Sequence, residues 1–120
     1  MIEREALVEM FESIANRGDW DMNQPMLWGY FFTHHDAAAL RAAIPHLQGL
    51  DYEFVEMFKS EKDDPQDDDL WWLHVQRIEV HTVDSLFARN ERLYEFASHH
   101  GLDSYDGMDV GPAPVVERPA

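Results

Sequence analysis

The hydrophobic positions of the chain form seven segments, and the most apolar is residues 25–33, PMLWGYFFT. Turn-forming residues flank it on both sides, and its aromatic side chains favour a strand over a helix. In a strand, Trp28 and Tyr30 point to one face and Leu27 and Phe31 to the other. Because both faces are largely apolar, we expect this strand in the middle of a sheet, with cover on at least one side.

Three segments show the spacing of an amphipathic helix. Thr33 or Asp36 could cap the second helix, and Thr82 or Asp84 the third. Pro45 is expected to kink or divide the second. The predicted helices cover residues 2–17, 37–49 and 83–100.

Three further segments alternate as strands do, over residues 50–60, 70–81 and 102–110. The first two form a predicted hairpin across an acidic loop, residues 61–69. The order after the first helix is therefore β-α-β-β-α-β, which predicts an α+β sandwich of ferredoxin-like type with the first and third strands central. The extra N-terminal helix should cover part of the sheet or its rim. We expect one domain over residues 1–110 and a flexible tail over residues 111–120.

Charge limits the partners of this domain. The sequence has 24 Asp and Glu against 9 Lys and Arg, a formal net charge of −15. Such a chain repels phosphate backbones and anionic lipid, so we expect no direct nucleic-acid or membrane partner. It can bind a basic protein, although acidity could also serve solubility alone. The absence of cysteine and of an apolar leader segment predicts a cytoplasmic protein.

Catalytic and metal-binding patterns find little support. The sequence has no HExxH, no GxSxG and no Gly-rich phosphate loop, so we predict no enzyme, no cofactor and no metal. The adjacent pairs His34-His35 and His99-His100 are expected to point apart. The acidic loop lacks the ligand spacing of an EF-hand, which leaves a solvated hairpin tip or a contact with a partner.

Two adjacent tryptophans follow the loop. Because neighbours in a strand face opposite sides, one of Trp71 and Trp72 should lie in the core and the other on the open face of the sheet. Cover by the N-terminal helix or a dimer contact would suit the outward one.

Several stretches together resemble the RraB family, the regulators of ribonuclease activity B. They are the apolar first strand, DAAALRAAI, the acidic hairpin loop, VDSLFARNERLYEFASHHG and the closing DSYDGM. The resemblance spans about residues 5–110. It implies a non-enzymatic protein that binds ribonuclease E and alters RNA turnover.

The predicted partner-binding residues come from the loop, the tryptophan pair and the closing motif. A homodimer is a further possibility. The alternative function is an immunity or antitoxin-like protein, whose acidic face would block another basic nuclease. The residues are Asp63, Asp64, Asp67, Asp68, Asp69, Trp71, Tyr105 and Asp106.

Overall fold

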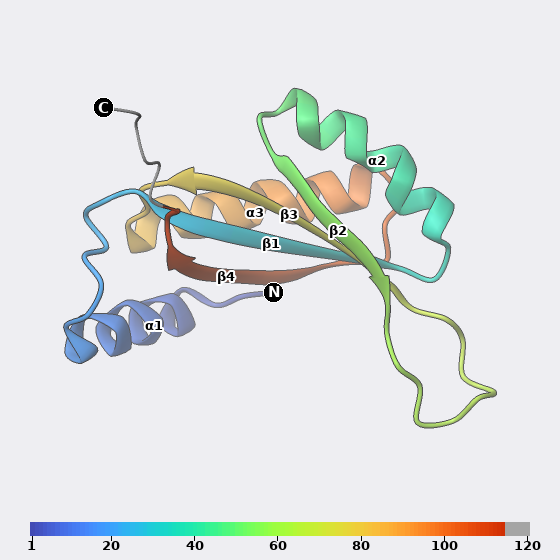
Figure 1. The fold of residues 1–120 in the computed structure, drawn as a ribbon, viewed down its shortest axis with the longest axis horizontal. Helices are drawn as coiled ribbons and strands as arrows, with labels where there is room; N and C mark the ends of the chain where they lie inside the picture. Colours follow the sequence, from blue (N-terminus) through green and yellow to red (C-terminus); the bar gives the residue numbers. More distant parts are fainter. Residues whose placement is uncertain (115–120) are drawn as a thin grey trace, which may run out of the picture.

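The computed structural model describes residues 1–114 and has three helices and one four-stranded antiparallel sheet (Figure 1). The predicted α+β class is confirmed, with element ends shifted by up to three residues. The elements are α1 (Arg4–Arg17), β1 (Met26–His34), α2 (Ala37–Gly49), β2 (Glu53–Lys59), β3 (Trp71–Glu79), α3 (Val83–His99) and β4 (Ser104–Pro112).

The sheet has the strand order β2-β3-β1-β4, and every neighbouring pair is antiparallel. The aromatic-rich β1 and β3 are central, as predicted, and β2 and β4 are the edges. This order is consistent with a ferredoxin-like sandwich. Of the predicted tail, Gly111 and Pro112 belong to β4, while residues 115–120 lie outside the described part.

One face of the sheet carries the core. Trp28, Tyr30 and Phe32 of β1 are fully buried there, together with Leu73 and Val75 of β3. Helices α2 and α3 cover this face, and the strands pass in front of α3 in Figure 1. Because large apolar side chains alternate along both central strands, burial fixes their register.

Helix α1 extends the helical layer at the β4 side of the sheet (Figure 1). Its Leu7 is fully buried, and the Phe11 ring stacks on Trp28 with centroids 6.2 Å apart. The backbone amide of Ile2 donates to the Tyr94 hydroxyl in α3 over 2.8 Å. The helix therefore lies at the β4 side and, through Phe11, covers part of the core face of the sheet, as predicted.

The helix ends settle the open choices among capping residues. Asp36 caps α2 by accepting from the amide of Ala38, and Thr82 forms a capping box with Ser85 at the start of α3. Helix α2 continues through Pro45 as one helix, so of the two outcomes predicted for Pro45, a kink or a division, the division is wrong. The ring lies in an undivided helix because neighbouring residues Leu40, Ala43 and Leu47 are buried against the sheet.

Candidate protein-binding surface

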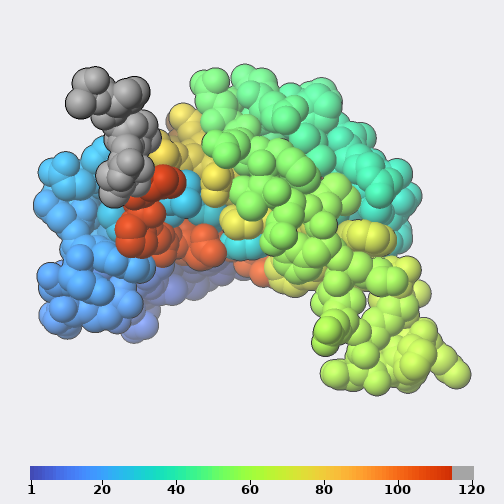
Figure 2. All heavy atoms as spheres, in the orientation of Figure 1, coloured from blue at the N-terminus to red at the C-terminus, as the bar shows by residue number. Residues whose placement is uncertain are grey.

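The acidic loop joins β2 to β3 and stands clear of the body of the molecule in Figure 2, at the lower right. Its residues lie outside regular structure, and Asp63, Asp67 and Asp68 are exposed. The Asp69 carboxylate pairs with the Lys62 ammonium at 2.5 Å, and this hydrogen bond lowers the pKa of Asp69. Within residues 1–114, no ion pair holds the first three carboxylates, so they are free to meet a cationic partner.

The tryptophans after the loop divide between the two faces, as predicted. Trp71 lies on the helix-covered side, half-buried against the core, with the Lys59 ammonium 6.0 Å from its ring. Trp72 lies on the other side, where no helix packs. Trp72 is therefore the outward tryptophan, and α1 does not cover it because α1 packs at the opposite edge, against α3.

The two predicted site residues of the closing motif, Tyr105 and Asp106, also lie on different sides of the sheet. Tyr105 is buried, its hydroxyl donates to Asn90 Oδ1 over 2.6 Å, and burial raises its pKa. It anchors β4 to α3 and presents no surface to a partner. Asp106, its neighbour, is exposed and lies at the edge of a hollow on the open face.

Three aromatic side chains meet on the open face, one from each of β1, β2 and β3. The Phe58 ring is parallel to Trp72, with centroids 6.1 Å apart and 3° between the planes. Phe31 meets Trp72 edge-on at 6.5 Å and stacks on His74 at 4.4 Å. We call Phe31, Phe58 and Trp72 the aromatic cluster. A hollow of about 450 Å³ adjoins it, lined also by Ser60, Asp106, Gly107 and Met108.

Carboxylates lie on the same face as this cluster, and the strands of the described chain place no Lys or Arg there. Glu56 pairs in register with His74, and the Asp109 carboxylate lies over Gly29 beside His74. The only strand cations in the described chain are Lys59 and Arg77, and alternation sends both to the helix-covered face. The open face is therefore aromatic in its centre and acidic at its rim.

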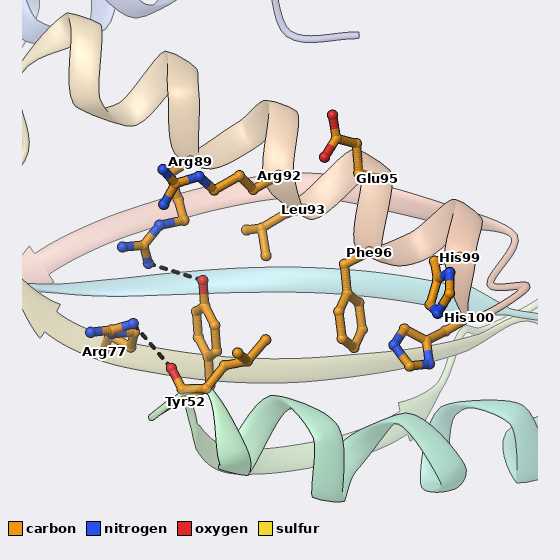
Figure 3. A pocket seen from close by; sticks show the side chains of 10 residues that line it. Tyr52, Arg77, Arg89, Arg92, Leu93, Glu95, Phe96, His99 and His100 are labelled. Atoms are coloured by element: carbon orange, nitrogen blue, oxygen red, sulfur yellow. Dashed lines mark hydrogen bonds between the residues drawn. The ribbon is translucent and has the colours of Figure 1, made fainter.

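A second hollow, of about 490 Å³, lies between α3 and the start of β2 (Figure 3). Figure 3 shows Arg77, Arg89 and Arg92 at one end and His99 and His100 at the other. Desolvation by burial lowers the pKa of His100, which favours its neutral form.

Two of the three arginines that line this hollow are hydrogen-bonded to other groups of the chain. Arg77 donates to the Leu50 carbonyl over 3.1 Å, and Arg89 donates to the Tyr52 hydroxyl over 2.9 Å. Both guanidinium groups also pair with Glu79, at 3.3 and 3.1 Å. This part of the hollow is thus built to hold β3, α3 and the start of β2 together.

The prediction that His34 and His35 point apart is wrong. Their rings stack, with centroids 4.2 Å apart, and both face Asp103, although adjacent residues were expected to diverge. The turn after β1 allows this, since His34 is the last residue of the strand and His35 already lies outside it. Asp103 accepts from the backbone amide and Nδ1 of His35 over 2.7 and 2.9 Å.

This His-His-Asp group has the donor types of a transition-metal site. However, the Nδ1 atom of His34 accepts from the amide of Asp36 over 2.8 Å, so the neutral ring carries its proton on Nε2. That Nε2 atom is the one facing Asp103, and it then offers no lone pair to a metal. The hydrogen bonds identify the group as a link between the end of β1 and the start of β4.

The comparison with protein families agrees with the resemblance. A family model described as regulator of ribonuclease activity B, RraB, matches residues 4–110. The chain belongs to the RraB family. No curated protein matches the sequence. The family match covers α1 to β4 and thus includes both the acidic loop and the open face. Within residues 1–114, no helix has the length and apolarity needed to cross a membrane.

The structure brings some predicted site residues together and separates others. Asp106 and the loop carboxylates lie on the side of the open face or at its end, whereas Trp71 and Tyr105 belong to the opposite side of the sheet. Trp72, Phe58 and Asp109 were not among the predicted site residues. The alternation of side chains along β2, β3 and β4 predicts that these residues share one face, but only when it is known which residue of each strand points into the core.

Proposed function

We propose that this RraB-family chain regulates a ribonuclease by binding it as a protein partner, without catalysing a reaction of its own. Ribonuclease E, or another nuclease with a basic segment, is the proposed partner. The observation that carries the proposal is the acidic loop, whose unpaired carboxylates project beside an uncovered face that has no cation on its strands. A basic segment of the nuclease would meet complementary charge there.

Electrostatic complementarity explains how such binding would affect RNA turnover. A basic segment of a ribonuclease attracts RNA phosphates, and an acidic protein bound to that segment would neutralise it. RNA or other partners would then bind there less strongly. The effect should weaken as salt rises, because exposed charges more than about 10 Å apart are largely screened at 0.1 M ionic strength.

The test uses purified ribonuclease E and a loop variant. Asp63, Asp67 and Asp68 are replaced together by Asn, which keeps size and removes three exposed charges. The control replaces Glu5, Glu9 and Glu12 of α1 by Gln, an equal charge change on another exposed surface. Binding and RNA cleavage are measured at low and moderate salt.

We expect the wild-type chain and the α1 variant to bind ribonuclease E and slow RNA cleavage, and the loop variant to lose most of both effects. Equal weakening by the two variants would show that only net charge matters and would contradict the role of the loop. If the chain fails to bind ribonuclease E but neutralises a toxin nuclease, the immunity function replaces this proposal.

A further inference from the structure

The open face of the sheet offers more than negative charge. Within the aromatic cluster, Phe58 is 38% exposed, and Phe31 and Trp72 are partly exposed. Helices α2 and α3 lie on the other side of the sheet, and α1 packs against α3. A group of solvent-accessible aromatics that no helix of the described chain covers is typical of a binding surface.

Glycines let neighbouring groups pack closely on this surface. The Asp109 carboxylate and the His74 ring lie over Gly29, where any side chain would clash with them. Gly107 has φ of +138°, a conformation that other residues rarely adopt, so its lack of a side chain is required by the backbone. Beside it lies the hollow of about 450 Å³, with Trp72 and Phe31 on one wall and Asp106 at the edge.

The negative charge at the rim of the open face determines which kind of partner can bind there. A second copy of this chain would bring a face rimmed by Glu56, Asp106 and Asp109 against its own carboxylates, and each copy has a net charge of −15. A nucleic acid would bring phosphates against the same rim. A cationic segment of another protein meets no such repulsion. Only Ser60 separates the acidic loop from the end of β2 that carries Phe58.

Aromatic rings between carboxylates favour arginine over lysine. A guanidinium group is planar, stacks on aromatic faces and forms paired hydrogen bonds with carboxylates, whereas an ammonium group is a strongly hydrated point charge. Trp gives the strongest cation–π attraction of the aromatic side chains. The Trp72 ring and the Asp106 carboxylate line the same hollow, so one arginine could contact both.

We propose that the aromatic cluster and its acidic rim form a docking surface for arginine side chains of the partner protein. This inference rests on the proposed function for the identity of the partner, and it adds a site and a residue preference to it. The loop would attract the basic segment, and the open face would hold its arginines. Trp72 is the central side chain of the site, since it contacts both Phe31 and Phe58.

The experiment measures binding of two synthetic peptides by calorimetry. Both have the same Gly/Ser background, and one carries arginines where the other carries lysines. Trp72→Thr removes the central ring and keeps a residue that favours strands. The matched control is Ile78→Thr, which removes a 55% exposed apolar side chain from the same face of the same strand, away from the aromatic cluster.

We expect the wild-type chain to bind the arginine peptide several times more tightly than the lysine peptide. Trp72→Thr should weaken binding of the arginine peptide about fivefold and remove the preference for arginine over lysine. Ile78→Thr should change neither the affinity nor the preference. The arginine peptide should also shift the indole N–H resonance of Trp72, which the Trp72→Thr spectrum assigns. Melting curves of both variants establish that they are folded.

Several results would overturn the docking surface. They are equal affinity for the two peptides, an unchanged affinity in folded Trp72→Thr, or self-association of the chain that Trp72→Thr abolishes. If only the loop variant weakens binding, the docking inference fails and the proposed function stands. If the arginine peptide binds as expected but ribonuclease E does not, the proposed function fails and the docking surface stands.

Discussion

The Tyr30 hydroxyl in the central strand donates a hydrogen bond to Glu79 Oε2 over 2.5 Å. The same carboxylate lies 2.8 Å from Nε2 of His81 and pairs with Arg89 at 3.1 Å. Burial raises the pKa of Glu79, but hydrogen bonds from His81 and Tyr30 and the charge of Arg89 outweigh it and lower the pKa to about 2. The ionised Glu79 carboxylate of β3 thus links side chains of β1 and α3 on the helix-covered face of the sheet.

Glu79 should make folding stability depend on acid pH. Since its pKa is about 2 in the folded chain against an ordinary 4.5, its ionised form favours folding. That contribution is complete above about pH 4.5 and is lost as the pH falls towards 2. We expect Glu79→Gln to lower the free energy of unfolding by about 2 kcal/mol at neutral pH, after allowance for solvent screening. The difference from wild type should shrink as the pH approaches 2 in denaturant titrations.

The control for this experiment is Glu95→Gln, the same chemical change at an exposed position of α3. It should leave the pH dependence of unfolding close to that of wild type. A constant difference between wild type and Glu79→Gln from pH 2 to pH 7 would contradict the assignment, because it would show a role that does not depend on ionisation.

Much of the sheet could be predicted because its pattern is simple. Trp28, Tyr30 and Phe32 recur every second position, and this alternation fixed both the strand and its central place. Pro45 shows where local rules fail. Its ring opposes a helix, but the burial of Leu40 and Leu47 on either side holds α2 as one element.

Helix α1 has two buried side chains, Leu7 and Ile14, and its docking should depend strongly on the first. Leu7 is fully buried, whereas the next residue, Val8, is 37% exposed. Removing a buried leucine side chain loses its transfer free energy and leaves a cavity, so Leu7→Ala should cost about 2–4 kcal/mol. Val8→Ala, the control, should change stability by about 0.5 kcal/mol or less. Equal effects in chemical denaturation would show that α1 does not dock through Leu7.

The candidate surface was harder to predict than the fold. The acidic loop is visible in the sequence as a run of charge, but which of two adjacent tryptophans faces outward depends on the register of β3. Trp71 pairs with His34 and Lys59, while Trp72 pairs with Thr33 and Phe58, and only these pairings show which ring joins the aromatic cluster. The burial of Tyr105 likewise follows from its contact with Asn90 on another element.

The Tyr105 hydroxyl should matter for stability because its partner is buried. Asn90 is 1% exposed, and Tyr105→Phe would leave its Oδ1 atom without the 2.6 Å hydrogen bond. An unsatisfied buried acceptor costs about 1–3 kcal/mol, and we expect a loss of about 2 kcal/mol in denaturant unfolding. In the background of Asn90→Ala the same change should cost clearly less. Additive costs would mean that the two groups do not interact.

His35 should titrate above the ordinary histidine range. Its hydrogen bond to Asp103 and the charge of that carboxylate raise its pKa above 6.5. A pKa raised by folding means that the protonated form favours the folded chain, and this contribution is present below pH 6.5 and lost as the pH rises through the folded pKa. Proton NMR titration of the imidazole measures it directly. Asp103→Asn should lower the pKa of His35, and an unchanged pKa in that variant would contradict the contact between the two side chains.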